Sequence, residues 1–262
     1  MTHRRLTSTI AIILMLALLA GYLYVYQIGP FSDTWNSLLI ELADPFTALL
    51  GAVMVTGVLL HYRRADKPYP VWLFFTLGMW FWVLAESTWS YIDFSSGATP
   101  SVGLPDVFWF IGYGLLGLAL VYQYSLVFRT KGLWWMVLAS WAGIVIVDLA
   151  LVWLGGLQFS PENLVNYAYP LLDFGLCLAS IRLFMTFGAG KLSRPWIGLL
   201  VMGISDAVFA WVQANGQYQV WSNAGMWLST FMDTSYVAAY LILAFGFLLQ
   251  YLLLRYGPEE AR

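Results

Sequence analysis

Eight stretches of the chain are apolar over the length that a helix needs to cross a lipid bilayer. The hydrocarbon core of a bilayer is about 30 Å thick, and about 20 apolar residues in a helix cross it. Backbone groups in lipid must be hydrogen-bonded internally, and runs of this length achieve that as helices rather than as short barrel strands. We expect spans at residues 10–26, 36–62, 70–93, 105–128, 132–154, 165–187, 195–214 and 229–254.

The composition agrees with a chain embedded in a membrane. Of its 262 residues, 61% are hydrophobic and 10% are charged, whereas soluble domains carry about 25% charged residues. We therefore predict an all-α, polytopic membrane protein with eight transmembrane helices and the lipid bilayer as its first partner. The formal net charge of -2 argues against nucleic acid as a partner.

The positive charges predict the orientation of the chain. They all lie on the side of the membrane that holds the N-terminus, either before the first span or in the loops and span ends on that side. They are Arg4, Arg5, Arg63, Arg64, Lys67, Arg129, Lys131, Arg182, Lys191, Arg194, Arg255 and Arg262. Loops rich in lysine and arginine remain in the cytoplasm. Both termini are therefore expected to be cytoplasmic.

The two halves of the chain carry matching landmarks in the same order. The segment LAESTWSY (84–91) aligns with ISDAVFAW (204–211), and DVFWFIGY (106–113) aligns with DTSYVAAY (233–240). The aligned segments pair Glu86 with Asp206, Asp106 with Asp233, Trp109 with Tyr236, and Tyr113 with Tyr240. Two further landmarks match in order: the prolines that open a helix in each half, Pro45 and Pro170, and the tryptophans that follow them, Trp72 and Trp196. An even number of spans in each half gives both copies the same orientation. We predict two parallel four-helix repeats, 1–131 and 132–262, which together form one membrane domain.

Seven acidic residues lie in the spans without a nearby lysine or arginine: Asp44, Glu86, Asp106, Asp148, Asp173, Asp206 and Asp233. A charged aspartate at a helix centre costs about 2.5–3.5 kcal/mol on the insertion scale, so such groups face the bundle interior or a wet cavity. Helical spacing agrees, because Glu86, Ser90 and Asp93 share one face, as do Glu41 and Asp44 with their neighbours.

These acids have a functional and a structural interpretation. In the first, they form an outward-facing acidic and aromatic pocket for a small ligand, a cation or a proton, built from Glu86, Asp206, Asp148, Asp173, Asp106, Asp233, Tyr113, Tyr240 and Trp89. In the second, the acids are hydrogen-bonded and only hold helices together, with Asp106 and Asp233 as helix N-caps. The tryptophans divide similarly into pocket walls and interfacial residues, and the candidates for the walls are Trp80, Trp82, Trp89 and Trp227.

Motifs for catalysis or cofactors are missing from the sequence. It has no Ser-His-Asp set, Walker A loop or H-E-x-x-H motif, and no lysine in a span for a Schiff base. Gly112, Gly114 and Gly117 match G-x-G-x-x-G but lie inside a span, where small residues favour helix packing. We expect a protein that is not an enzyme, with no cofactor and no bound metal.

One segment resembles a known class of membrane region. Pro100–Ser101, Asp106, Trp109 and Gly112–Tyr113 are similar to a pattern in the multi-helix sensor regions that precede diguanylate cyclases and histidine kinases in bacteria and archaea. The resemblance implies a sensor in the plasma membrane of a prokaryote. The residues after the last span are too few for an output domain, so we expect a separate cytoplasmic or membrane partner.

The leading hypothesis is a non-catalytic membrane sensor or receptor module. The first alternative is a cation- or proton-coupled transporter that uses the same acids, since parallel repeats suit alternating access. The second is a structural accessory subunit of a larger membrane complex. The sequence leaves open whether the chain forms a homodimer or a larger complex.

Overall fold

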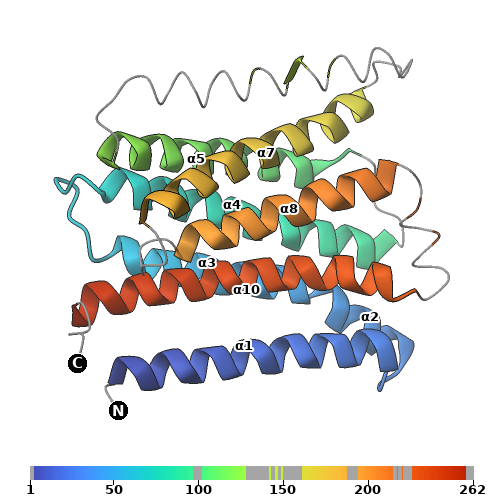
Figure 1. Ribbon diagram of the computed structural model, residues 1–262. Helices are drawn as coiled ribbons and strands as arrows, with labels where there is room; N and C mark the ends of the chain where they lie inside the picture. The colour runs from blue at the N-terminus through green and yellow to red at the C-terminus, as the bar shows by residue number, and fades with distance from the viewer. Residues whose placement is uncertain are drawn as a thin grey trace.

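The computed structural model describes residues 3–96, 102–127, 161–187, 194–214 and 226–257, with isolated residues in between. These segments are helical (Figure 1). The helices are α1 (His3–Ile28), α2 (Asp33–Glu41), α3 (Ala43–Leu59), α4 (Tyr69–Ser96), α5 (Leu104–Val127), α7 (Pro161–Phe187), α8 (Arg194–Ala214) and α10 (Trp227–Tyr256).

The all-helical prediction is confirmed for the described residues. Six helical stretches are long and apolar enough to cross a membrane, and Pro195–Phe209 is a shorter apolar one, as in a multi-pass membrane protein. The predicted span 132–154, and with it Asp148, lies outside the described residues. The count of eight spans therefore stays a prediction.

The span predicted at 36–62 is present as the apolar helical stretch Asp33–Leu59, which is interrupted at Leu42. Helix α2 ends before Leu42, and α3 starts after it with Pro45 in its first turn. A proline has no N–H, so the carbonyl of Glu41, four residues earlier, loses its helical donor. The hydroxyl of Ser90 on α4 replaces that donor at 2.6 Å.

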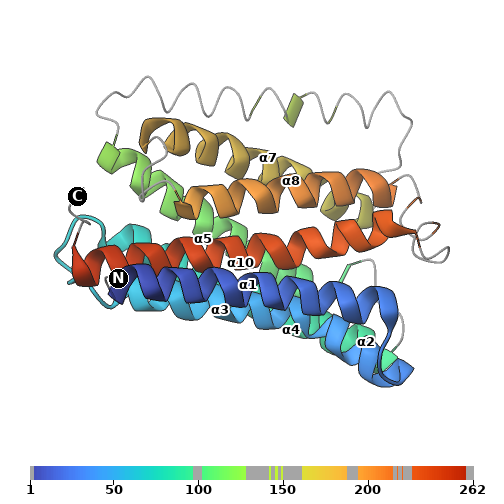
Figure 2. The ribbon, with the colours of Figure 1, turned by 60° about the horizontal axis from the view of Figure 1, so that its bottom comes forward.

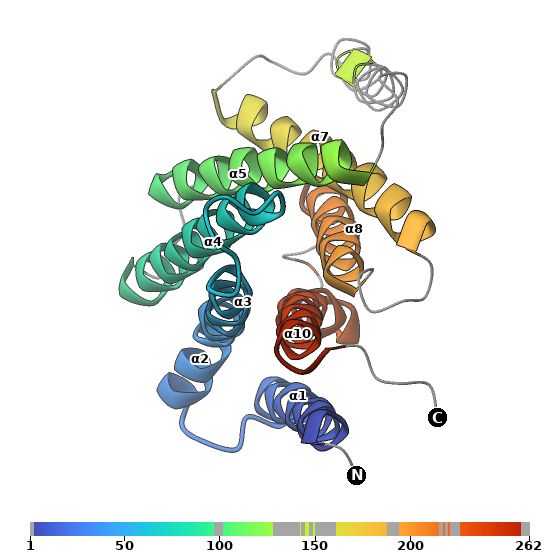
Figure 3. The same cartoon turned by 90° about the vertical axis from the view of Figure 1, so that its left-hand side faces the viewer.

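Six of the described helices follow one another around the bundle (Figure 3). Helix α4 packs between α3 and α5, α8 packs between α7 and α10, α10 packs against α3, and α5 meets α7. Helix α1 lies outside this ring against α10 (Figure 2). The neighbour relations within α3–α4–α5 recur within α7–α8–α10, which are the helices that the predicted repeat pairs.

Glycines let the helices approach one another closely. A Cβ on Gly78 of α4 would lie 2.9 Å from Cγ of Leu116 on α5, and a Cβ on Gly198 of α8 would lie 2.8 Å from the backbone of Leu243 on α10. In lipid, small residues favour such packing because helices there associate mainly through close van der Waals contact. Large buried side chains fill the remaining interior: Phe75, Met79, Trp82, Trp196, Tyr240 and Phe247.

The described basic residues gather at one end of the bundle, which we call the basic end. The start of α1, the α3–α4 connection, the start of α8 and the end of α10 all lie there (Figure 1). The described acidic residues of the spans lie at or beyond the middle of their helices, on the side away from this end. The positions agree with the predicted charge asymmetry, and the assignment of the basic end to the cytoplasm stays a prediction.

Candidate functional site

Tyr113 brings together acidic side chains from two other helices. Its hydroxyl, on α5, lies 2.9 Å from Oδ2 of Asp206 on α8 and also hydrogen-bonds with Asp173 on α7. The hydroxyl of Tyr113 has one proton, so it can donate to only one of these two carboxyls. A deprotonated carboxylate only accepts hydrogen bonds, so the other carboxyl can bond to the same hydroxyl oxygen only if it carries a proton itself.

Glu86 of α4 is the second centre of hydrogen bonding. Its Oε1 accepts from the hydroxyl of Tyr240 on α10 at 2.5 Å and from Nε1 of Trp109 on α5 at 3.3 Å. Tyr236 of α10 lies near Asp206 and packs against Phe209 of α8, with ring centroids 5.8 Å apart. We call Glu86, Asp173 and Asp206, with Tyr113, Tyr236 and Tyr240, the tyrosine–carboxyl network.

The bonds of this network cross between the two predicted repeats. Tyr113 in the first half bonds to Asp206 in the second, and Tyr240 in the second half bonds to Glu86 in the first. Trp82 lies between the two crossing tyrosines, with ring centroids 5.4 Å from Tyr113 and 6.1 Å from Tyr240. The positions paired by the sequence alignment thus make corresponding contacts, although the duplication itself stays a prediction.

Asp106 has a capping role at the edge of this network. Its Oδ2 accepts from the backbone N–H of Gly103 at 2.7 Å, which is one half of a capping box at the start of α5. Its Oδ1 accepts from the hydroxyl of Tyr169 at 2.6 Å. The first-turn role expected for Asp106 is therefore present, with the side chain at the third helical position rather than at the N-cap.

Asp233 makes a hydrogen bond to α1, outside the tyrosine–carboxyl network. It is in the second turn of α10, so the N-cap interpretation is wrong. Its Oδ2 accepts from the hydroxyl of Tyr26 on α1 at 2.5 Å, and Gln27 of α1 bonds to Thr230 one turn earlier. Asp233 thus attaches α1 to the bundle.

The candidate tryptophans occupy different environments. Trp89 packs against Trp109 at 5.5 Å between ring centroids, which places it beside a partner of Glu86. Trp80, near the middle of α4, and Trp227, the first residue of α10, are exposed on the surface of the bundle. Of the two, Trp227 has the position of an interfacial-belt residue. Of these candidates, Trp82 and Trp89 lie against the network.

Two contacts of the site were missed by the sequence analysis. Tyr169 was not among the candidates, although the landmark Pro170 follows it directly in the sequence. A second acid pair, Glu41 of α2 and Asp93 of α4, lies close enough to interact across the two helices. The sequence predicted an acidic face at 41–44 and another at 86–93, and these two faces could have predicted that Glu41 and Asp93 lie close together.

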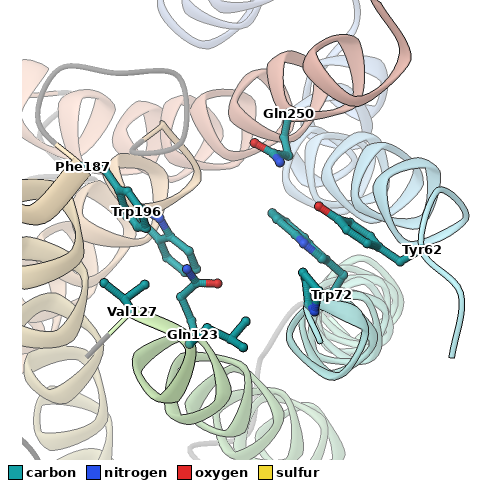
Figure 4. Close-up of a pocket in the computed structure, with 9 residues that line it drawn as sticks. Tyr62, Trp72, Gln123, Val127, Phe187, Trp196 and Gln250 are labelled. Atoms are coloured by element: carbon teal, nitrogen blue, oxygen red, sulfur yellow. The ribbon is translucent and has the colours of Figure 1, made fainter. Parts of the chain in front are cut away.

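A cavity of about 220 Å³ opens near the basic end, away from the acids (Figure 4). Its lining consists of Tyr62, Pro68, Trp72, Gln123, Leu126, Val127, Phe187, Trp196 and Gln250. None of the predicted site residues is among them. The predicted pocket and this cavity are therefore different places in the molecule.

The chain matches no protein-family model, and no curated protein or solved structure matches it. Its resemblance to sensor regions therefore stays a prediction. In the described segments, no group of three or more His, Cys, Asp or Glu side chains is arranged to hold a metal ion.

Proposed function

We propose that this chain is the membrane part of a non-catalytic sensor, in which the tyrosine–carboxyl network responds to protons. The observation that carries the proposal is that Asp173 and Asp206, on two different helices, both bond to the single hydroxyl of Tyr113. Such a group of acids is held together by a shared proton. Loss of that proton would place two negative charges side by side in a medium of low dielectric constant.

A proton suits this site better than a larger ligand does. The carboxyl groups of Glu86 and Asp206 are already bonded to tyrosine side chains of the protein. A bulky ligand would have to displace those bonds, whereas a proton only redistributes them. The cavity near the basic end is lined by different residues. A second cavity of about 250 Å³ on α8 and α10 contains no member of the network in its lining, which is Val201, Ile204, Ser205, Val208, Phe231, Met232 and Ser235.

The network is also in a position to change the packing of the whole bundle. Its members come from α4, α5, α7, α8 and α10, and each of these helices continues to the basic end. Repulsion between Asp173 and Asp206 would favour a state in which α5, α7 and α8 are less tightly packed. A separate partner at the basic end would then bind one of the two states better than the other.

The test measures whether the basic end moves with pH. Spin labels are attached to cysteines introduced at Lys67 and Met185, both exposed, in a background with Cys177→Ser. We expect the distance distribution between the labels to shift when the pH changes. The shift should disappear in Asp206→Asn and persist in Asp33→Asn, a matched change at an exposed site.

The outcomes separate the hypotheses. A shift that survives in both Asp206→Asn and Glu86→Gln would contradict the proposal, because the responding group would then lie elsewhere. Proton flux through the protein in liposomes, abolished by Asp206→Asn, would support a transporter instead. No movement and no flux would leave the acids as helix-pinning groups of a structural subunit.

A further inference from the structure

The cavity at the basic end is lined by side chains from both halves of the chain. Gln123 of α5 and Gln250 of α10 lie on opposite sides of it (Figure 4). Trp72 and Tyr62 form one of the remaining walls, and Trp196 and Phe187 form the other. The cavity thus has two amide sides and two aromatic sides.

These facing residues are also equivalent positions of the predicted repeat. Gln123 follows Asp106 by the same interval at which Gln250 follows Asp233. Tyr62 and Phe187 likewise follow Pro45 and Pro170 at one interval, and Trp72 and Trp196 are themselves landmarks of the alignment. The two sides of the cavity therefore offer similar chemistry to a molecule placed between them.

The size and shape of the cavity favour a single flat ring. Its volume of about 220 Å³ is below the about 300–1,000 Å³ of most ligand pockets, so a drug-sized molecule does not fit. The ring of Trp72 is stacked with that of Tyr62, with 8° between their planes. Aromatic walls of this kind suit a planar ligand.

The polar groups of the lining favour an uncharged ligand with hydrogen-bond acceptors. None of the nine described lining residues is charged. Gln250 is 3% exposed, and its amide can donate as well as accept. Trp196 is nearly fully buried and contributes an apolar wall. The hydroxyl of Tyr62 is uncharged at neutral pH and lies beside Gln250 in the lining (Figure 4).

We infer that this cavity binds the head group of a quinone. A quinone is flat, uncharged and soluble in the membrane, and it carries two carbonyl acceptors on opposite edges of one ring. The amides of Gln123 and Gln250 match those two edges, and the tryptophans cover its faces. The site is separate from the tyrosine–carboxyl network, so this inference stands or falls independently of the proposed proton response.

The test compares two rings of the same outline on the full chain in lipid nanodiscs. Duroquinone has four methyl groups and two carbonyl oxygens, and hexamethylbenzene has methyl groups in place of the oxygens. We expect equilibrium dialysis against empty nanodiscs to show saturable binding of one duroquinone per chain. Hexamethylbenzene should bind at least about tenfold more weakly, because it leaves the amides without acceptors.

Matched variants locate the site. Changing Gln123→Leu and Gln250→Leu together removes both amides at similar side-chain size and should weaken duroquinone binding about tenfold. Gln27→Leu, the same change at the far end of the bundle, should leave binding unchanged. Equal binding of the two rings, no saturable excess over empty nanodiscs, or an equal loss in Gln27→Leu would each overturn the inference.

Discussion

At the scale of single residues, the glycines of α5 differ in what they do. A Cβ on Gly112 would lie 2.6 Å from Nε1 of Trp82 and 3.3 Å from the carbonyl oxygen of Gly78 on α4. A Cβ on Gly114 or Gly117 would meet nothing within 4 Å. The sequence suggests a packing role for Gly112, Gly114 and Gly117, and of these three only Gly112 has it.

We predict that Gly112→Ala destabilises the protein by about 1–3 kcal/mol, the usual cost of overpacking a well-filled core. Trp82 is 2% exposed and lies against Tyr113 and Tyr240, so it cannot move without disturbing the network. Thermal unfolding in detergent measures the change. Gly117→Ala is the matched control and should be neutral, and equal unfolding temperatures for both variants would contradict this account.

Helical periodicity and the internal alignment were enough to bring several site residues together. Glu86, Asp206, Tyr113 and Tyr240 lie on interior faces and at paired positions, and they meet in the structure. The bond of Asp233 to α1 could not be predicted, because α1 carries none of the aligned landmarks. The bond of Asp173 to Tyr113 depends on how α7 packs on α5, which no local pattern encodes.

At the scale of helices, the break between α2 and α3 depends on an exchange of hydrogen-bond donors. Pro45 at the start of α3 cannot donate to Glu41, and Ser90 of α4 donates instead. The proline was visible in the sequence, but its substitute donor comes from a residue far along the chain. The sequence therefore indicated that Pro45 opens a helix, but not how the carbonyl of Glu41 regains a donor.

We predict that Ser90→Ala destabilises the protein by about 1–3 kcal/mol, because a backbone carbonyl in a poorly hydrated place loses its partner. Hydrogen–deuterium exchange should also become faster in α2, which is held to α4 at this point. Ser95→Ala is the matched control, since the hydroxyl of Ser95 is exposed and bonds within its own helix. If both variants exchange alike, the carbonyl of Glu41 does not depend on Ser90.

At the scale of the whole molecule, the acids and the cavity occupy opposite halves of one bundle. The network lies in the half away from the basic residues, and the cavity lies beside the basic end. Charge patterning could predict which half holds the acids, since every acid of the spans was far from the lysines and arginines. A cavity is where side chains fail to fill space, so neither periodicity nor charge could reveal it.

This separation makes the orientation of the bundle decisive for function, because it sets which compartment each site faces. The positive-inside rule predicts that the α3–α4 connection is cytoplasmic and that the start of α2 is outside. Single cysteines are introduced at Lys67 and at Asp33, which are both exposed. The background variant is Cys177→Ser, because among the described contacts the native thiol bonds only to the carbonyl of Leu200. We expect a membrane-impermeant maleimide to label the Asp33→Cys variant in intact cells and the Lys67→Cys variant only after permeabilisation. The reverse pattern would turn the tyrosine–carboxyl network toward the cytoplasm and make it a sensor of internal rather than external protons.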